Sequence, residues 1–436
     1  MSSRIPVISI FSLLTTWWAA AQAPETEQEP LQKAHAREAR ALHERLVTLD
    51  THVDIEGPTY ATEKLDPGIE NPELRCDLVK MSKGHMDGVF LAVYVGQPRD
   101  GLNAAGYARA YERARALFDA IRRLPRMHPD RCELVTSVGE LSPVLERGHH
   151  AIMIGVENGY PIGEDLSRLA EFHGLGARYV TLCHSRHNQV CDSSSQEKPL
   201  HNGLSDFGKT VVAEMNRLGI MIDVSHISEK SFWDVIATSK APAIASHSGC
   251  AAVHAHDRNL TDEQLRGLAK VNGVIQIVSV ASFLKKEAPE HRDAVLKLRQ
   301  ELQLPSWREI SDMSEEERNA LRPKVAAYER RRAEIERAIP GATLADMIAH
   351  LEHAIQVAGI DHVGIGSDFD GGGGVAGFAN HAEAGNITLE LARRGYSEEE
   401  IGKIWGGNLL RVWRQVEKVA SELQAQGHEK KEQGEH

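Results

Sequence analysis

Residues 150–157, HAIMIGVE, form a short aliphatic run that ends in a carboxylate, Glu157. A run of this length, apolar between its two end residues and bounded by polar segments, is typical of a strand that is buried on both faces, as in a parallel sheet. Similar runs occur at seven other places along the chain: 46–50, 88–95, 178–183, 219–224, 242–246, 273–280 and 361–367. The sequence therefore predicts eight strands of the parallel type.

Helical patterns fill most of the gaps between these runs, at 105–124, 165–175, 206–218, 228–239, 261–270, 343–358 and 397–418. Strands and helices that alternate eight times over this length predict an α/β fold, a (β/α)8 TIM barrel. A doubly wound open sheet is the alternative, and a Gly-x-Gly-x-x-Gly turn after the first strand would favour it. The first strand is followed by Thr51-His52-Val53-Asp54 instead, which favours the barrel.

A long charged segment, residues 284–342, interrupts this alternation between the seventh and eighth strands. Its stretch 315–339 is rich in strong helix formers and in opposite charges four residues apart, so it predicts a helical insertion that projects from the barrel. A lid over the site, a contact in a homodimer and a solvated hairpin with neither role are all consistent with the pattern.

The two ends of the chain differ in character from the barrel, which we assign to residues 36–420. Residues 1–23 have Arg4, an apolar run and small residues before an acidic stretch, and so resemble a secretory signal cleaved after Ala21 or Ala23. An uncleaved membrane tether is the alternative. Residues 24–35 are predicted to be a linker and 421–436 a charged, frayed tail. The protein is therefore expected to be exported, periplasmic or secreted.

The composition argues against nucleic-acid binding and does not settle how the cysteines pair. The 436 residues are 42% hydrophobic and carry a formal net charge of -12, with acidic and basic residues interspersed. Without a basic stripe to neutralise phosphates, nucleic acid is not an expected partner. Five cysteines, an odd number, leave at least one thiol unpaired within the chain, and Cys183 and Cys191 are close enough in sequence to form a bridge.

Polar residues stand at the ends of six of the eight predicted strands. In barrels of this type the loops at the carboxyl ends of the strands share one mouth, where the chemistry takes place. A side chain at such an end is therefore a candidate functional residue. The candidates, in chain order, are His52 and Asp54 after the first strand, then Glu157, His184, His226, His247 and Asp368.

Imidazoles and carboxylates in this number predict a metal site. Two divalent metals close together need one ligand that bridges them, and a glutamate is such a ligand. We therefore expect His52 and Asp54 on one metal, His226 and His247 on the other, and Glu157 between them. Nitrogen and oxygen ligands without thiolate favour zinc, with cobalt or manganese as substitutes.

Each candidate also has a structural interpretation. Asp54 could cap a helix, Glu157 could form a salt bridge at the rim, and His184 could pack beside Cys183. Asp368 has a rival in Asp370, two residues on. The glycines at 371–374 lack the Lys and Ser/Thr of a phosphate-binding loop, so they do not indicate a nucleotide site.

Taken together, the motifs resemble the membrane (renal-type) dipeptidase family of zinc metallopeptidases. The resemblance spans roughly residues 45–415 and rests on motifs that follow the family's order. They are DTHVD (50–54), GVENG (155–159), YVTLCH (179–184), IDVSHIS (222–228), ASHS (245–248), DRNL (257–260), HVGIGSDFDG (362–371), RGYS (394–397) and GGNLLRV (406–412).

The resemblance implies a dipeptidase that hydrolyses the amide bond of free dipeptides with a hydroxide bridging two zinc ions, and that tolerates a D-residue at the C-terminal position. It assigns the ligand set given above, His184 to the substrate carbonyl, Arg258 to the substrate carboxylate, and Asp368 to acid/base chemistry. These roles match what amide hydrolysis needs: an oxyanion stabiliser, a bidentate cation and a proton donor.

Residues 158–163, after Glu157, depart from the family pattern. The stretch 185–196 and the insertion 284–342 do not align with the family, and these changes bear on specificity rather than on hydrolysis. Another binuclear hydrolase on the same barrel, such as a deaminase, a lactonase or a phosphotriesterase-like enzyme, is the competing function. Those enzymes commonly begin with His-x-His and use a carboxylated lysine, whereas this chain has His52-Val53-Asp54 and no such lysine. A non-catalytic binding barrel is the third alternative.

Overall fold

The fold is described by a computed structural model that covers residues 25–55, 57–98, 101–305, 309–310, 313, 315–339 and 341–432. Its centre is a nearly closed barrel of parallel strands, which confirms the predicted (β/α)8 fold. Around the barrel the strands run in the order β1 (Leu49–Asp54), β2 (Gly88–Tyr94), β4 (His150–Glu157), β5 (Ala177–Thr181), β6 (Met221–Asp223), β7 (Ala243–Cys250), β9 (Val274–Ile277) and β10 (Val363–Ile365). Two short outer strands, β3 (Cys132–Leu134) and β8 (Asn259–Leu260), pair with β4 and β7.

The first strand begins and ends later than the sequence predicts. The run 46–50 suggested a strand that ends before His52, but β1 continues to Asp54. The backbone N–H of Asp54 donates to the Phe369 carbonyl at 2.9 Å, and the N–H of Asp368 donates to the His52 carbonyl at 2.9 Å. These bonds continue the ladder beyond β10 and join the last strand to the first. They bring Asp368 next to His52 and Asp54.

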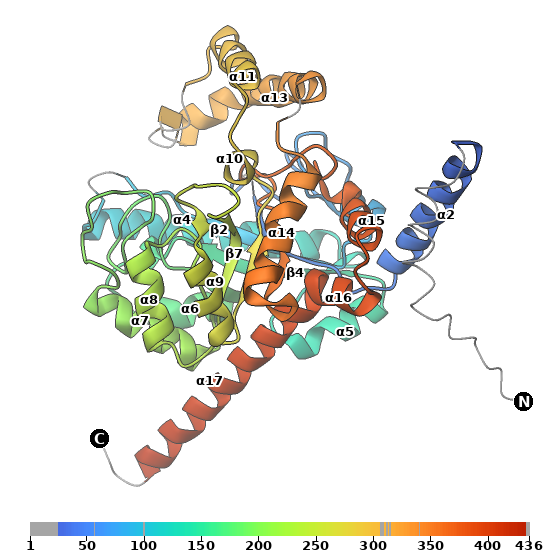
Figure 1. Cartoon of the computed structure of the whole chain (residues 1–436). Coiled ribbons are helices and arrows are strands. Elements are labelled where there is room, and N and C mark those ends of the chain that lie inside the picture. The colour runs from blue at the N-terminus through green and yellow to red at the C-terminus, as the bar shows by residue number, and fades with distance from the viewer. Residues whose placement is uncertain are drawn as a thin grey trace, which may run out of the picture.

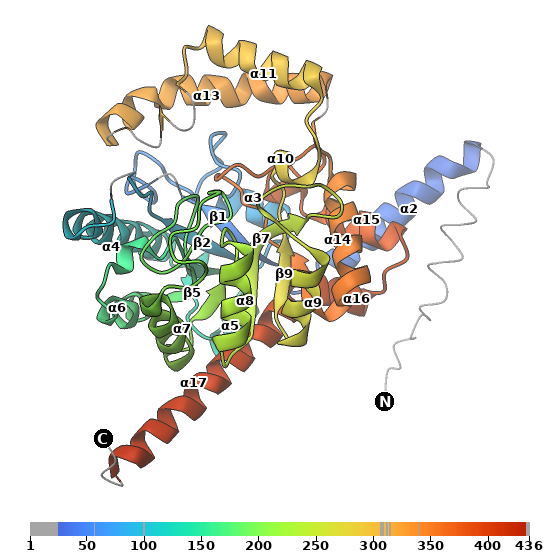
Figure 2. The same cartoon turned by 60° about the vertical axis from the view of Figure 1, so that its left-hand side comes forward.

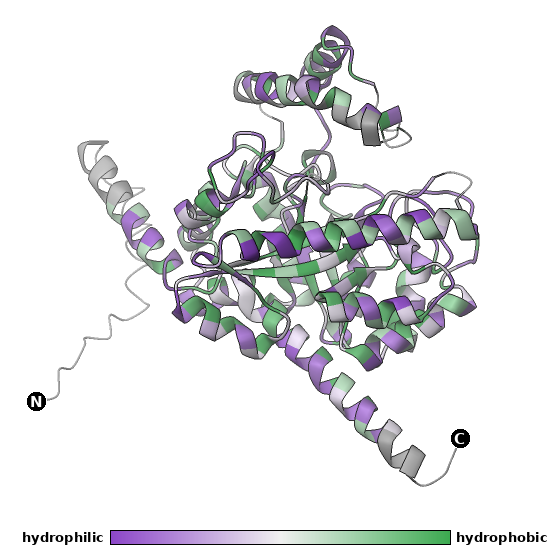
Figure 3. Ribbon diagram, turned by 180° about the vertical axis from the view of Figure 1, so that it is seen from behind, coloured by the Kyte–Doolittle hydropathy of each residue, from purple (hydrophilic) through white to green (hydrophobic). Residues whose placement is uncertain are grey.

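Helices cover the outside of the barrel, with bounds close to those predicted: α4 (Ala104–Met127), α6 (Ser167–Leu175), α7 (Asp206–Leu218), α8 (Glu229–Thr238), α9 (Asp262–Lys270) and α14 (Leu344–Ala358). Side chains cap several of them, as when Thr261 and Gln264 form a capping box at the start of α9. The outer helices mix hydrophilic and hydrophobic residues along their length (Figure 3), as expected for helices with one face on a core. Shorter helices α3 (Leu78–Lys83), α5 (Val138–Glu146), α15 (Gly385–Arg393) and α16 (Glu398–Gly402) complete the layer.

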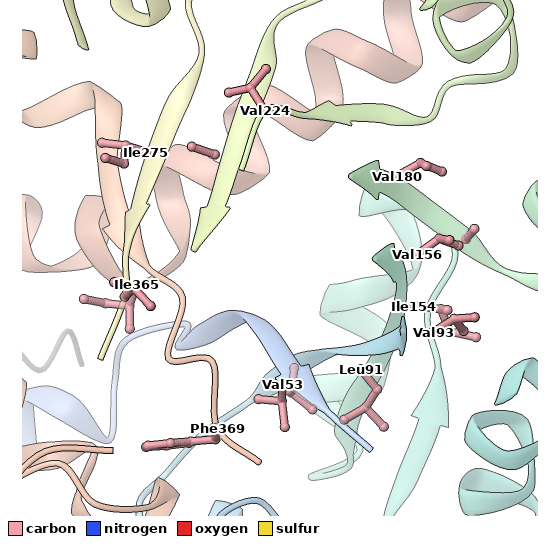
Figure 4. Packing of buried hydrophobic residues seen from close by; sticks show 14 of the residues in the cluster. Val53, Leu91, Val93, Ile154, Val156, Val180, Val224, Ile275, Ile365 and Phe369 are labelled. Atoms are coloured by element: carbon pink, nitrogen blue, oxygen red, sulfur yellow. The ribbon is translucent and has the colours of Figure 1, made fainter. Parts of the chain in front are cut away.

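The hydrophobic core lies between strands and helices. Aliphatic side chains on successive strands, among them Val53, Leu91, Ile154, Val180 and Ile275, are fully buried and form one cluster (Figure 4). A second cluster, which includes Phe90, Tyr179 and Trp413, continues the buried packing. All five cysteines are buried and free, so the bridge between Cys183 and Cys191 that the sequence left open is not formed.

The predicted insertion is helical. After the short helix α10 (Ala281–Leu284), α11 (Pro289–Glu301) and α13 (Glu315–Ala338) form a hairpin beyond the barrel, on the side where the chain leaves β9 (Figures 1 and 2). Leu298 and Tyr328 are buried, and the guanidinium of Arg299 lies 5.6 Å from the Tyr328 ring centroid. The hairpin therefore has a small core of its own. It lies on the side of the barrel where the strands have their carboxyl ends.

Both ends of the described chain are helical. The segment predicted to be a linker, residues 24–35, is helical from Glu25 onwards, as part of α2 (Glu25–His43). Its last residue, His43, is buried and lies 2.7 Å from the Thr388 hydroxyl of α15, which anchors the helix. Likewise α17 (Asn408–Glu432) extends through most of the tail predicted to be frayed and projects from the barrel (Figure 1).

The signal predicted for residues 1–23 lies outside the described residues, so export stays a prediction. Within the described part of the chain, no helix combines the length and the apolarity needed to cross a membrane.

Candidate metal and active site

The predicted site residues lie together at the carboxyl ends of the strands. His52 and Asp54 are on β1, Glu157 is the last residue of β4, and His247 is in β7. His184, His226 and Asp368 follow β5, β6 and β10. The side chains are buried or half-buried, and none is fully exposed. The rule that strand ends carry the chemistry thus located seven residues from six separate strands.

Glu157 stands at the centre of the cluster. Its Oε1 lies 3.0 Å from Nε2 of His226, 3.5 Å from Nε2 of His247 and 3.6 Å from Nε2 of His184. Its Oε2 lies 3.6 Å from Nε2 of His52. One oxygen therefore faces three imidazoles and the other faces the fourth, which is the placement a bridging carboxylate requires.

A second group of carboxylates lies on the far side of His52. The Nε2 of this histidine is 3.7 Å from Oδ2 of Asp54 and 3.9 Å from Oδ1 of Asp368. A Cβ atom on Gly371 would overlap both carboxylates, so the chain can pass so close to them only with glycine at this position. Asp370, the predicted rival of Asp368, accepts hydrogen bonds from the backbone N–H groups of Arg75 at 2.7 Å and Cys76 at 3.3 Å.

Two metal-candidate histidines are oriented by partners on their Nδ1 atoms. Nδ1 of His52 lies 2.7 Å from the hydroxyl of Tyr179, which is fully buried on β5. Gly155 makes room for that tyrosine, since a Cβ there would enter its ring. Nδ1 of His247 lies 2.8 Å from the hydroxyl of Ser246. Both contacts turn the Nε2 atoms toward the centre of the site, as hydrogen-bond partners of metal-bound histidines do.

Asp223, at the end of β6, forms buried hydrogen bonds to the segments that carry His184, His226 and His247. Its carboxylate accepts hydrogen bonds from the hydroxyls of Ser246 at 2.6 Å and Thr181 at 2.5 Å, and from the backbone N–H groups of Ser225 and Ser246. The supporting roles of Asp223 and Tyr179 escaped the sequence analysis. Their signal was present, because each lies on a predicted strand and precedes a site histidine by a few residues.

Two site residues have left-handed backbone conformations, His226 with a φ of 69° and Asp368 with a φ of 60°. Side chains other than glycine adopt this region rarely and at a cost of about 1–3 kcal/mol. In both places the chain turns sharply just after a strand, which directs the side chain inward over the barrel mouth. Such conformations gather at functional sites, where surrounding contacts hold them.

Burial and charge shift the acid–base properties of the cluster. Burial lowers the pKa of His226 and of His247 well below the usual value, and the nearby charge of Arg258 acts in the same direction at both, so the neutral imidazole is favoured. Burial alone would raise the pKa of Glu157, but the imidazoles of His184 and His52 lower it well below its usual range. Neutral imidazole and ionised carboxylate are the forms that bind metal.

Asp368 behaves differently from Glu157. Burial raises the pKa of its carboxyl well above the usual value, and the negative charges of Asp54 and Glu157 act in the same direction. A carboxyl group in such surroundings favours the protonated form, which is the state a proton donor needs.

The donor set fits divalent cations. Three overlapping groups have ligand atoms within 4.8 Å of one another: His52, Glu157 and His247; Glu157, His184 and His226; and His52, Asp54 and Asp368. Nε2 of His52 and Nδ1 of His226 are buried without a hydrogen-bond partner. A buried imidazole nitrogen without a partner is unfavourable unless another group binds it, and a cation at Nε2 of His52 would do so. His184, assigned by resemblance to the substrate, is also within reach of a cation here.

Arg258 lies beside the cluster, just before β8. Its Nη2 donates to the His247 carbonyl at 3.0 Å, and the residue is only 5% exposed. Arg258 and His226 line a cavity of about 400 Å³ between the loops that follow β5, β6 and β7. A buried guanidinium that faces a cavity next to the cluster can bind an anionic group there.

Comparisons with known proteins identify the family of this chain. Residues 36–427 match the family model described as "Membrane dipeptidase (Peptidase family M19)". The chain is 32% identical over 349 residues to dipeptidase tcpJ of Claviceps purpurea (strain 20.1), covering 79% of this chain and 70% of that protein. It is also 32% identical over 358 residues to dipeptidase verJ of Clonostachys rogersoniana, covering 81% and 79%.

Solved structures share the fold. The probable dipeptidase PvdM from Pseudomonas aeruginosa superimposes with a TM-score of 0.75 and 30% identity, over 89% of this chain and 100% of that one. A metallo peptidase from Rhodobacter sphaeroides, liganded with a phosphinate mimic of the dipeptide L-Ala-D-Ala, has the same fold, with a TM-score of 0.64 and 24% identity over 85% and 99%. The family model covers nearly the whole barrel, the relatives are dipeptidases, and the cluster at the strand ends offers metal ligands. The chain therefore belongs to the membrane dipeptidase family of metallopeptidases, peptidase family M19.

Proposed function

We propose that this protein hydrolyses the single amide bond of free dipeptides with the help of two divalent cations, zinc in the first instance. The ligands in this proposal are His52 and Asp54 for one cation and His226 and His247 for the other, with Glu157 shared. The observation that carries it is the position of the Glu157 carboxylate, with His226 3.0 Å from one oxygen and His52 3.6 Å from the other.

Bound cations of this kind supply a water nucleophile activated at neutral pH and polarisation of the scissile carbonyl. The protein's own task is to hold the dipeptide and to manage charge and protons around the reacting carbon. His184, 3.6 Å from Oε1 of Glu157, can donate a hydrogen bond to the carbonyl oxygen as negative charge develops on it.

Asp368 is suited to the proton transfer to the leaving amine. Its carboxyl lies 3.9 Å from Nε2 of His52, at the edge of the cluster, and its surroundings favour the protonated form. After it gives up the proton, the carboxylate can accept the next one from water, so the same group serves as acid and then as base.

Arg258 supports the choice of a dipeptide as substrate. A guanidinium next to the cluster can bind the terminal carboxylate of the substrate in a bidentate manner, which fixes the scissile bond one residue away. We further propose that a D-residue is accepted at the C-terminal position. The Rhodobacter sphaeroides metallo peptidase is liganded with a mimic of L-Ala-D-Ala, and that relative motivates the extension.

The function is tested with the purified chain freed of metal by a chelator and then reloaded with Zn²⁺, Co²⁺ or Mn²⁺. We expect reloading to restore hydrolysis of L-Ala-L-Ala and L-Ala-D-Ala, while L-Ala-L-Ala-L-Ala and the amidated dipeptide are cleaved far more slowly. Full activity without metal, or equal rates on dipeptide and tripeptide, would contradict the proposal. Turnover of a lactone or a phosphotriester without turnover of any dipeptide would favour the competing hydrolases.

A further inference from the structure

We infer that Phe283, in the short helix at the base of the insertion, positions the guanidinium of Arg258 for the substrate carboxylate. The inference rests on the proposed function, since it concerns the residue proposed to bind that carboxylate. The Cζ atom of Arg258 lies over the Phe283 ring, 5.3 Å from its centroid. This is within the distance at which an aromatic face attracts a cation.

The position of this guanidinium depends on few other contacts. Among the described residues its hydrogen bond is the one from Nη2 to the His247 carbonyl, and Nε is buried without a hydrogen-bond partner. The attraction of a ring for a cation grows when water is excluded, and this side chain is almost completely buried. The ring therefore supplies a large share of what orients the charge.

Phe283 is itself fixed by contacts with the segment that carries Arg258. Its carbonyl accepts a hydrogen bond from Nδ2 of Asn259 at 2.7 Å. Its ring lies 4.5 Å from the ring of His256, centroid to centroid, and Nδ1 of His256 accepts a hydrogen bond from the backbone N–H of Arg258 at 3.1 Å. Ring, loop and guanidinium thus form one packed unit.

A second connection holds α10 to the barrel. The carbonyl of Leu284 lies 2.8 Å from Nε2 of His350 on α14, and Nδ1 of the same imidazole accepts from the backbone N–H of Cys250 at the end of β7. Phe283 therefore stands on a rigid support, a requirement for a residue that positions another. Because α10 begins the projecting hairpin (Figure 2), the base of the insertion contributes to the substrate site.

A double-mutant cycle tests the inference, with kcat/KM for a free dipeptide as the measure. Phe283→Leu keeps an apolar side chain but removes the aromatic face, and we expect kcat/KM to fall about fivefold, mostly through KM. Arg258→Ala is expected to cause a much larger loss. If Phe283 acts through Arg258, the double variant is no worse than Arg258→Ala alone.

Two further variants keep the result interpretable. Phe283→Tyr retains the ring and should retain kcat/KM within about twofold, and it serves even if Phe283→Leu folds poorly. The matched control is Phe207→Leu, which changes a half-buried phenylalanine on α7. We expect it to leave kcat/KM for the free dipeptide unchanged, both alone and when combined with Arg258→Ala. Multiplicative losses in the double variant, or a Phe283→Tyr as impaired as Phe283→Leu, would overturn the inference. An enzyme that hydrolyses no dipeptide at all would instead overturn the proposed function.

Discussion

Replacing Tyr179 with phenylalanine removes one oxygen atom and tests whether His52 is a metal ligand. The hydroxyl of Tyr179 lies 2.7 Å from Nδ1 of His52, while Nε2 of the same ring faces Glu157 and Asp54. For Nε2 to bind a cation, Nδ1 must carry the proton, and its N–H then donates a hydrogen bond to the tyrosine oxygen. Burial raises the pKa of Tyr179, so its phenol stays neutral and can accept this bond.

The size of the effect follows from what Tyr179→Phe leaves behind. The ring stays packed against Phe90, 5.4 Å away, so no cavity larger than a hydroxyl is created. The N–H of His52 is left buried without an acceptor, which costs about 1–3 kcal/mol. Because that cost falls mainly on the metal-bound form, we expect cation affinity to drop about 10- to 100-fold.

The measurement is Zn²⁺ affinity by competition with a chromophoric chelator, with thermal unfolding of the metal-free protein alongside. Tyr160→Phe is the matched control, since Tyr160 is equally buried but its hydroxyl donates to the Gly101 carbonyl, away from the cluster. We expect the control to lose some stability and no metal affinity. Equal Zn²⁺ affinity in Tyr179→Phe and the unmodified protein would refute the assignment of His52.

Three further substitutions have distinct expected outcomes. Asp368→Asn should keep the bound metal but lower kcat at least 100-fold, because the amide cannot transfer the proton; retained turnover in steady-state assays would move that role elsewhere. Gly371→Ala should reduce the metal content measured by mass spectrometry, because the new Cβ overlaps the carboxylates of Asp54 and Asp368. An unchanged metal content would contradict this expectation. Asp50→Ala should lower the free energy of unfolding by about 3–5 kcal/mol in urea titrations. The variant removes a buried carboxylate that lies 2.8 Å from Nε2 of His381 and accepts the backbone N–H of Ser367 at 2.9 Å. A loss below about 1 kcal/mol would contradict this structural role.

The sequence predicted the barrel and its metal candidates because both depend on local patterns. Apolar runs that end in His or a carboxylate mark strand ends, and barrel topology brings those ends together. It did not predict Tyr179 and Asp223 as supports, because their place on a predicted strand, a few residues before a site histidine, does not show which groups their side chains contact. Nor did it extend β1 to Asp54, since that extension depends on pairing with Leu91 and Ala92 of β2 and with Phe369, more than 300 residues later.

At the N-terminal end of the chain, the composition does not decide between a linker and a helix. The Glu- and Gln-rich composition before His35 is common to linkers and to exposed helices. In the structure this segment belongs to helix α2, which the contact of His43 with Thr388 anchors on α15. The contact between Phe283 and Arg258 joins residues 25 positions apart across β8, α9 and β9, and no periodicity indicates it. Packing of this kind appears only once the fold is known.

The most direct test of the account is the number and position of bound cations, measured by anomalous scattering from crystals of the zinc-loaded protein. We expect two zinc ions per chain, both within bonding distance of the Glu157 carboxylate, one beside His52 and Asp54 and the other beside His226 and His247. A single ion, or ions bound away from Glu157, would contradict the central claim.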